Sequence, residues 1–475
     1  MCGKTTKIIL KIMKVLLILG SLCFLSVNIL LPLFYRKPDP TYADQIAETE
    51  FESDTSGKER ILCIDDNEEA LLWRLRMIGS AKKSIVLATF DLRPDENGTK
   101  LMAAIYEAAN RGVGVRLLID GIYEPVFLRR NDLFRTLSAH ENIEVKIYNP
   151  IAVSNLFRLN YRMHDKYLIV DDRMYLLGGR NSNDIFLGDQ TTGINVDRDI
   201  LVYDTSAGSG ESLLELQDYF EQIWGEACVR ETQVKPDKIS ADILEASIEQ
   251  FLKCYGELKE KYPDLEQYQE WEEATSAADK ITLISNGTNP GRKSPQVLCT
   301  IEYLAVGGED VLIQTPYVIC NRFMYDVLHQ IAENAELRII LNAVEKGSNP
   351  WGCTDYLNHR EDILDTGAEV YELMNEHAVH TKTVLVDDHI SIVGSYNLDL
   401  RSTYLDTELM LVIDSEELNE HIRGMSETYM EKSKAIYSDG TEEEGPLYQE
   451  KELRPKKKLI YQVLRVLTRP VRHLL

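Results

Sequence analysis

Two copies of one stretch decide the fold: HDKYLIVDDRMYLLGGRN at residues 164–181 and HTKTVLVDDHISIVGSYN at residues 380–397. Histidine, lysine, aspartate, glycine and asparagine recur in both copies at the same internal spacing. Chance does not place so many polar residues at matching positions. The sequence therefore predicts an internal duplication, and each copy is expected to supply one half of a shared site.

Each copy is predicted to form a β-hairpin that brings its polar residues to one place. His164 and Lys166 are two residues apart, as are His380 and Lys382, and alternate residues of an extended chain face the same way. An apolar strand, an acidic turn and a second short strand follow in both copies. The hairpin then returns to the glycine pair and the asparagine, where glycine lets the backbone approach a ligand closely.

Two such hairpins facing each other across a pseudo-twofold axis make a phosphate-handling site. Two lysines and two asparagine amides can surround a phosphodiester and stabilise the charge that builds on it. One neutral imidazole can attack phosphorus while the other, protonated, gives its proton to the leaving alkoxide. Lysine supplies the positive charge, so neither a metal nor another cofactor is expected.

Acidic residues near each copy have two predicted roles. Asp199 and Glu408 follow the asparagines and are expected to orient the imidazoles. Asp171 and Asp387 belong to the motif, but their position at the hairpin turn favours a structural role over proton transfer. Ser395 takes the place of Gly179 and offers either a hydrogen bond to phosphate or simply a small side chain.

Around both copies, apolar strands alternate with helical patterns in the same order, which predicts an α/β fold of two similar α-β-α halves. Val115–Asp120 aligns with Leu337–Asn342 as the strand that precedes each motif. The predicted segments are an anchor (1–36), a linker (37–60), the first half (61–228), a helical connector (229–279), the second half (280–436) and a tail (437–475). Within this tail, residues 438–452 are expected to be a disordered acidic link.

Charge and cysteine content exclude some classes of protein. The net charge is −25, yet both ends of the chain are basic, so the body between them is more acidic still. Such a body repels a nucleic-acid backbone, whose binding depends on neutralising phosphates. The eight cysteines are scattered without metal-ligand spacing and are interpreted as thiols outside any disulfide framework.

The N-terminus is predicted to anchor the chain in a membrane. Val15–Tyr35 is an uncharged run long enough to cross a bilayer, and four lysines precede it. The positive-inside rule then favours a single-pass protein of the cell membrane with a cytoplasmic N-terminus. A cleaved signal peptide is the alternative, although no small-residue cleavage site follows the apolar run.

The C-terminus is also predicted to be directed to the membrane. Leu459–Leu475 has apolar residues at helical spacing with arginines offset, after three consecutive lysines. This pattern is typical of a basic amphipathic helix on anionic lipid. A solvated basic tail is the alternative interpretation.

The duplicated pattern resembles the HKD motif of the phospholipase D superfamily. Within that superfamily the chain is similar to bacterial cardiolipin synthases, through GGRN at 178–181, GSYNLDLRSTYLDTE at 394–408 and TPY at 315–317. Two departures concern the subtype and acceptor: many relatives have two membrane spans, and asparagine often stands at the place of Asp406.

The resemblance implies a role for each motif residue. His164 would be the nucleophile and His380 the general acid, although the near-equivalence of the half-sites leaves the reverse assignment open. The phosphate would be bound by Lys166, Lys382, Asn181 and Asn397. Arg401 is expected either to position lipid phosphate or to pair with Asp399.

The implied reaction is transfer of a phosphatidyl group from a donor phospholipid to phosphatidylglycerol. Neither the donor nor a protein partner can be read from the sequence. Hydrolysis to phosphatidic acid by a phospholipase D is the main alternative, because its site residues would be the same. A nuclease of the same superfamily and an inactive membrane scaffold are two further candidates.

Overall fold

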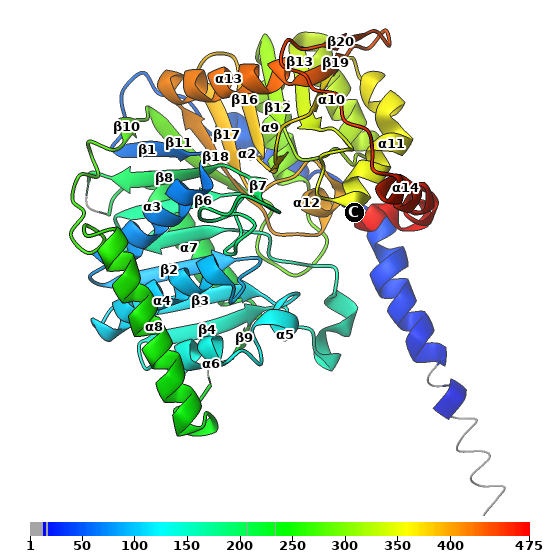
Figure 1. Ribbon diagram of the computed structural model, residues 1–475. Helices are drawn as coiled ribbons and strands as arrows, with labels where there is room; N and C mark the ends of the chain where they lie inside the picture. The colour runs from blue at the N-terminus through cyan, green and yellow to red at the C-terminus, as the bar shows by residue number, and fades with distance from the viewer. Residues whose placement is uncertain (1–12, 16–17, 207, 233) are drawn as a thin grey trace, which may run out of the picture.

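The structure is a computed structural model that describes residues 13–15, 18–206, 208–232 and 234–475. Among these described residues, a single helix, within Met13–Leu30, is long and apolar enough to cross a membrane, and it projects away from the body (Figure 1). The π-helical turn η1 (Ser26–Leu30) and the 3-10 turn η2 (Leu31–Leu33) join it to the body. The basic residues before residue 13 lie outside the described residues.

A nine-stranded sheet forms the first half, in the order β10-β1-β8-β6-β5-β2-β3-β4-β9. Neighbours β2, β3 and β4 run parallel, and the other pairs are antiparallel. The strands are β1 (Glu59–Ile64), β2 (Ser84–Thr89), β3 (Gly114–Asp120), β4 (Ile143–Tyr148), β5 (Tyr167–Val170), β6 (Met174–Gly178), β8 (Asp199–Asp204), β9 (Arg230–Glu231) and β10 (Ser276–Ala277).

The second half repeats this topology in the order β11-β18-β17-β16-β12-β13-β14-β19-β20. Here β12, β13 and β14 are the parallel neighbours. The strands are β11 (Lys280–Ser285), β12 (Asp310–Gln314), β13 (Glu336–Asn342), β14 (Glu369–Leu373), β16 (Thr383–Val386), β17 (Ile390–Gly394), β18 (Leu409–Asp414), β19 (Ser433–Ile436) and β20 (Glu442–Glu444). The predicted duplication into two α/β halves is confirmed.

Helices cover the sheets, and their starts follow from local sequence. Asp66, Asp95 and Asn321 each accept hydrogen bonds from the first-turn amides of a helix, which are otherwise unsatisfied. The helices are α3 (Asn67–Ser80), α4 (Glu96–Asn110), α5 (Glu124–Phe127), α6 (Asp132–Ser138), α7 (Glu211–Trp224), α8 (Ala241–Lys261), α9 (Gln296–Val306), α10 (Arg322–Asn334), α11 (Pro350–Leu364), α12 (Leu400–Tyr404) and α13 (Glu416–Glu431).

Three apolar cores hold the layers together. One joins the first sheet to α3, α4, α6 and α8, and a second joins the second sheet to α9, α10 and α11. The third core draws on α7, α13 and both sheets, for example through Leu177 and Leu411. The two halves are therefore one packed body (Figure 1), and buried apolar area of this extent is the main source of their association.

The connecting segments are more structured than the sequence predicts. The linker contains α2 (Pro40–Glu48), whose Tyr42 hydroxyl lies 2.9 Å from Thr300 Oγ1 on α9. The acidic link expected to be disordered contains β20, which pairs with β19. Its glutamates find cationic partners on the body, as Glu442 does with Arg360 at 2.7 Å, and this offsets the cost of ordering the segment.

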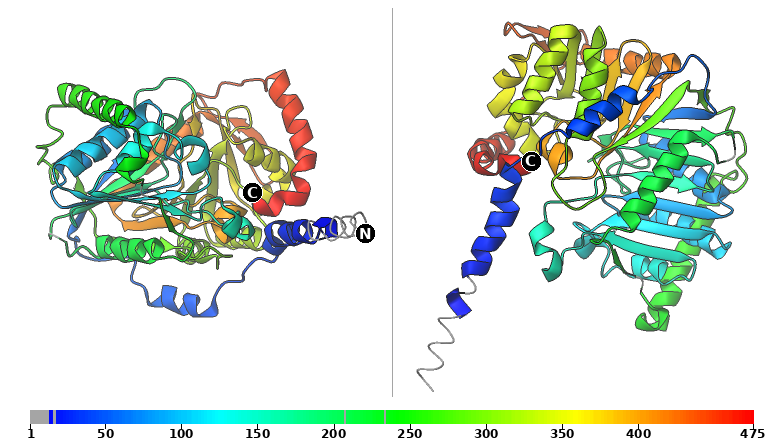
Figure 2. Two further views of the ribbon diagram at one scale, coloured as in Figure 1. Left: turned by 90° about the horizontal axis from the view of Figure 1, so that it is seen from below. Right: turned by 180° about the vertical axis from the view of Figure 1, so that it is seen from behind.

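The C-terminal tail folds back onto the body. Helix α14 (Pro455–Leu467) packs on α11, and the 3-10 helix η5 (Arg469–Leu474) ends beside the N-terminal helix (Figure 2). The predicted helix is therefore present, but it is docked along one face. All seven cysteines in the described residues are free thiols.

Candidate active site

Each motif histidine is held by the backbone of the opposite half. The His164 N–H donates to the carbonyl of Thr407 at 3.2 Å, and the His380 N–H donates to the carbonyl of Val196 at 2.6 Å. Met163 pairs with Thr407 in a parallel bridge, and β15 (Ala378–Val379) pairs in parallel with β7 (Asn195–Val196). The two histidine strands are thus joined to each other's half by matching contacts, as a pseudo-twofold axis requires.

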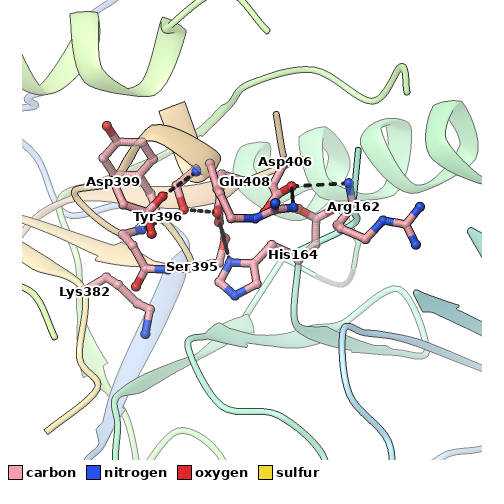
Figure 3. A network of polar contacts seen from close by, with 12 residues as sticks. Arg162, His164, Lys382, Ser395, Tyr396, Asp399, Asp406 and Glu408 are labelled. Carbon is pink, nitrogen blue, oxygen red and sulfur yellow. Dashed lines mark hydrogen bonds and ion pairs between the residues drawn. The ribbon is translucent and has the colours of Figure 1, made fainter. Parts of the chain in front are cut away.

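A carboxylate from the opposite half orients each imidazole. Nδ1 of His164 lies 2.9 Å from Glu408 Oε1 (Figure 3), and Nδ1 of His380 lies 2.6 Å from Asp197 Oδ2. Each acid directly follows the residue whose carbonyl binds the histidine N–H. A carboxylate at Nδ1 keeps the proton of a neutral imidazole there and leaves Nε2 as the nucleophilic nitrogen.

Asp199 does not take the part that the sequence predicts for it. Its carboxylate is buried between two guanidinium groups, 2.9 Å from Arg74 and 3.2 Å from Arg180. The strand register explains the correction: Gly178 pairs with Asp199, whereas Gly394 pairs with Met410. The residue that corresponds to Glu408 therefore lies two places before Asp199.

Gly179 and Ser395, predicted to bind substrate, contact the orienting acids instead. A Cβ atom on Gly179 would lie 2.3 Å from Asp197 Oδ1, so only glycine leaves room for that carboxylate. The Ser395 hydroxyl donates to Glu408 at 2.5 Å and accepts from the Leu409 N–H at 3.0 Å. Ser402 donates to the other Glu408 oxygen at 2.5 Å, so this acid is fixed from three sides.

The lysines and asparagines gather at the same place from both halves. Both lysines are buried, and each Nζ donates to the carbonyl of the histidine two residues before it. Asn181 Oδ1 and Asn397 Oδ1 are buried and have no hydrogen-bond partner among the described residues. Buried amide groups are nearly always paired, so a matching unpaired set in both halves indicates a place for a polar ligand.

Burial shapes the electrostatics of the site. It lowers the pKa of His164 well below the usual value and that of His380 to about 4, with nearby lysines acting in the same direction. Burial also lowers the pKa of Lys166 to about 7 and raises that of Glu408 to about 7. Asp197 differs, because Lys382 and His380 outweigh burial and lower its pKa to about 2. Both imidazoles are therefore neutral near pH 7 before a ligand enters.

Aromatic rings line the approach to each histidine. Phe90 lies edge-on to His164 and Phe186 edge-on to His380, with ring centroids 5.1 Å apart in both cases. The side chains of the two histidines are only 12% and 16% exposed. The sequence did not identify either phenylalanine, although Phe186 lies in the insertion that distinguishes the first half. Interactions with charge are strong in such a water-poor site.

The motif aspartates lie at the far end of the hairpin strand from the histidines. Asp171 accepts from the backbone N–H groups of Lys82, Lys83 and Ser84 at 2.6–2.9 Å. Asp387 accepts from Glu309 and Asp310 at 2.8 and 3.0 Å. Both act as structural fasteners between the hairpin turn and the start of a central strand, and they contact none of the reacting groups.

Two supporting residues escaped the sequence reasoning. Asp120, at the end of β3, accepts from the Met163 N–H at 2.8 Å, and Asn342, at the end of β13, accepts from the Val379 N–H at 2.8 Å. They occupy equivalent places and hold the residue before each histidine. The alignment of the two strand sequences contains this signal, because both end in a polar side chain next to the motif.

Arg401 pairs with Asp406 rather than with Asp399, its Nη2 lying 2.9 Å from Asp406 Oδ1. It also binds the backbone of Asn160. Elsewhere, Cys63, Asp65 and His421 form one group of three possible metal ligands among the residues that the structure describes. Asp65 is already paired there with buried Arg198 at 2.8 Å, which competes with a cation.

Comparison with known proteins places the chain in the phospholipase D superfamily. The model of the family described as "Cardiolipin synthase, PLD-like domain" matches residues 75–224 and 301–429, and the chain belongs to this family. It is accordingly a phospholipase D-type phosphatidyltransferase. The two matched segments correspond to the two halves of the fold.

Individual relatives agree with this assignment. The chain is 25% identical over 395 residues to cardiolipin synthase C of Escherichia coli, covering 75% of this chain and 81% of the relative. It is 25% identical over 396 residues to an uncharacterized protein of Helicobacter pylori, covering 76% and 77%. Phosphatidylserine synthase of Haemophilus influenzae shares the fold with a TM-score of 0.63 at 18% identity, covering 92% of this chain and 99% of that one.

Proposed function

We propose that this protein is a membrane-bound cardiolipin synthase that transfers a phosphatidyl group to phosphatidylglycerol through a phosphatidyl-histidine intermediate. The supporting observation is the pair of imidazoles, each backed at Nδ1 by a carboxylate of the opposite half. The buried lysines and unpaired asparagine amides beside them suit a phosphodiester anion. The likeness to cardiolipin synthases supports the choice of substrate.

The unequal carboxylates support His164 as the nucleophile and His380 as the acid. Asp197, with its pKa near 2, stays ionised and stabilises an imidazolium at His380. Glu408, with its pKa raised to about 7, supports a positive charge on His164 less strongly. An arriving phosphodiester also pairs with Lys382, which relieves the repulsion that lowers the His380 pKa.

The reaction would proceed in two displacements at phosphorus. His164 Nε2 forms a bond to phosphorus as the bond to the donor alkoxide breaks, and His380 gives the alkoxide its proton. The now neutral His380 then takes the proton from a hydroxyl of phosphatidylglycerol, whose oxygen displaces His164. Lys166, Lys382, Asn181 and Asn397 would hold the phosphoryl oxygens in both steps.

The test is lipid mass spectrometry with the purified full chain in vesicles of defined composition. Isotope-labelled phosphatidylglycerol is supplied alone or with phosphatidylethanolamine, so that the label in cardiolipin identifies the donor. We expect labelled cardiolipin from the wild type and none from His164→Ala. Folded protein that yields only phosphatidic acid would contradict the transferase and favour a hydrolase.

A substrate with a good leaving group separates the roles of the two histidines. An alkoxide needs a proton to leave, whereas p-nitrophenolate does not. We therefore expect His380→Ala to release nitrophenol from phosphatidyl-p-nitrophenol while failing on natural lipid. His164→Ala should fail on both, and the opposite pattern would reverse the assignment.

A further inference from the structure

Helix α14 presents to solvent the face that a helix of a soluble protein usually buries. Residues Lys457, Tyr461, Arg465 and Thr468 share the face that contacts the body. The opposite face carries exposed apolar side chains, which are Leu459, Ile460, Val463, Val466 and Leu467. Leu459 and Val466 are 62% and 65% exposed. An exposed apolar patch of this kind marks an interaction surface.

The polar side of α14 is fixed to the body, so this orientation is set by the structure. Lys457 donates to the carbonyls of Glu345 and Gly347 at 3.0 and 3.2 Å. Arg465 donates to Asn358 Oδ1 at 2.8 Å. Cations that remain exposed flank the apolar face, and these are Arg454, Lys456, Lys458 and Arg469.

The same surface continues to the N-terminal helix and to the first half. His473 Nε2 lies 2.6 Å from the carbonyl of Ile29, and Asn160 donates to the carbonyl of Asn28 at 2.5 Å. Both carbonyls belong to the candidate membrane span. Just before Asn160, the 3-10 helix η3 (Val153–Arg158) exposes Val153 by 86% and Phe157 by 45%. Figure 2 shows α14 and the foot of the N-terminal helix close together.

We propose that α14, η3 and the foot of the N-terminal helix form one surface that lies in the headgroup region of an anionic bilayer. The apolar side chains enter the acyl boundary, and the exposed lysines and arginines pair with lipid phosphates. The contacts to residues 28 and 29 place η3 and η5 where the span leaves the membrane. This inference rests on the membrane placement in the proposed function, and it adds that lipid reaches the site beside the tail.

The experiment measures membrane depth on the full chain in vesicles of phosphatidylcholine and phosphatidylglycerol. An environment-sensitive fluorescent amino acid replaces Val463, Phe157 or, as the matched control, Leu252. Leu252 is also exposed, but it lies on α8, away from α14 (Figure 2). Lipids with brominated acyl chains quench fluorescence only at the boundary. We expect blue-shifted, quenched emission at positions 463 and 157 and neither effect at 252.

Charge dependence completes the test. In Lys456→Gln/Lys458→Gln the quenching at 463 should fall, whereas the exposed control Lys238→Gln should leave it unchanged. Quenching at 463 and 157 no greater than at 252 would overturn the proposal. The readout requires no turnover and applies equally to His164→Ala, so failure of this surface and failure of the transferase are distinguishable.

Discussion

At the residue scale, the site depends on two acids that each half lends to the other. Glu408 has three donors from His164, Ser395 and Ser402, whereas Asp197 sits beside a lysine and fits only because residue 179 is glycine. The two imidazoles therefore have unequal partners despite the duplicated motif. Unequal basicity is what a pair of groups needs to divide the tasks of nucleophile and acid.

Replacing Asp197 and Asp199 separately tests the corrected assignment. Asp197→Asn removes the charge that stabilises the His380 imidazolium, and we expect kcat to fall on the order of 100-fold or more. Asp199→Asn leaves Arg74 and Arg180 with a neutral partner and should lower the free energy of unfolding by roughly 3 kcal/mol. Transfer kinetics and thermal unfolding measure the two effects. A folded Asp199→Asn protein without activity would refute the assignment.

Glu408 predicts a particular pH dependence of stability. Its pKa is raised from 4.5 to about 7 by burial, so the folded state binds its proton more tightly than the unfolded state does. The resulting stabilisation is complete below about pH 4.5 and is lost as pH rises to 7, amounting to about 3 kcal/mol. Glu408→Gln cannot titrate, so its Tm should gain on that of the wild type over this range. Exposed Glu420→Gln is the control, and parallel Tm profiles for wild type and Glu408→Gln would contradict the expectation.

At the element scale, the motif hairpin is a rigid unit fastened at both ends. At the histidine end, Asp120 and Asn342 hold the residues before the two histidines. At the turn, Asp171 and Asp387 have φ values of 55° and 49°, a left-handed conformation that aspartate tolerates better than most residues. Their carboxylates bind the amides that begin β2 and β12. The motif aspartate thus aligns the hairpin within the sheet.

Asp387→Ala tests this architectural role. The change leaves the amides of Glu309 and Asp310 without their acceptor and places alanine at a positive φ, so we expect a loss of roughly 1–3 kcal/mol in the free energy of unfolding. The kcat per folded molecule should stay near that of the wild type. Asp388→Ala, at the exposed neighbouring position, should change stability by less than about 0.5 kcal/mol. A loss of kcat in a fully folded Asp387→Ala protein would support a role in proton transfer instead.

The sequence predicts the elements better than it predicts their contacts. Apolar runs and helical periodicity identify β2, α4 and β3 because local patterns determine them. The assignment of Asp199 fails because the insertion before β8 hides the register, which backbone pairing sets across the sheet. Helix α2 and strand β20 are ordered by contacts with distant residues, and no local pattern records such contacts.

At the scale of the whole molecule, the tail joins the anchor, the body and the edge of the site. Arg472 binds buried Asp355 at 2.6 and 2.9 Å, and the backbone N–H of Arg401 donates to the Leu475 carbonyl at 3.0 Å. Arg401 in turn pairs with Asp406, two residues before Glu408. The end of the chain is therefore connected to an orienting acid through only a few contacts.

Asp355→Asn should release the tail while leaving the catalytic halves folded. Loss of the ion pair with Arg472 leaves this guanidinium without its counter-charge, so the tail should open more often. We expect hydrogen exchange in residues 455–475 to become at least about tenfold faster, with the core strands unchanged. Asp326→Asn, at an exposed ion pair on α10, is the control. Unchanged exchange in the tail would show that other contacts hold it.

The exchange of carboxylates between the halves has a consequence for how such a protein arises. A single ancestral half could not orient its own histidine, because the acid that does so approaches only from a second copy. Such an ancestor would act only as a pair of identical chains. After the genes fused, each copy was free to change alone, and glutamate in one half opposite aspartate in the other is the trace of that freedom.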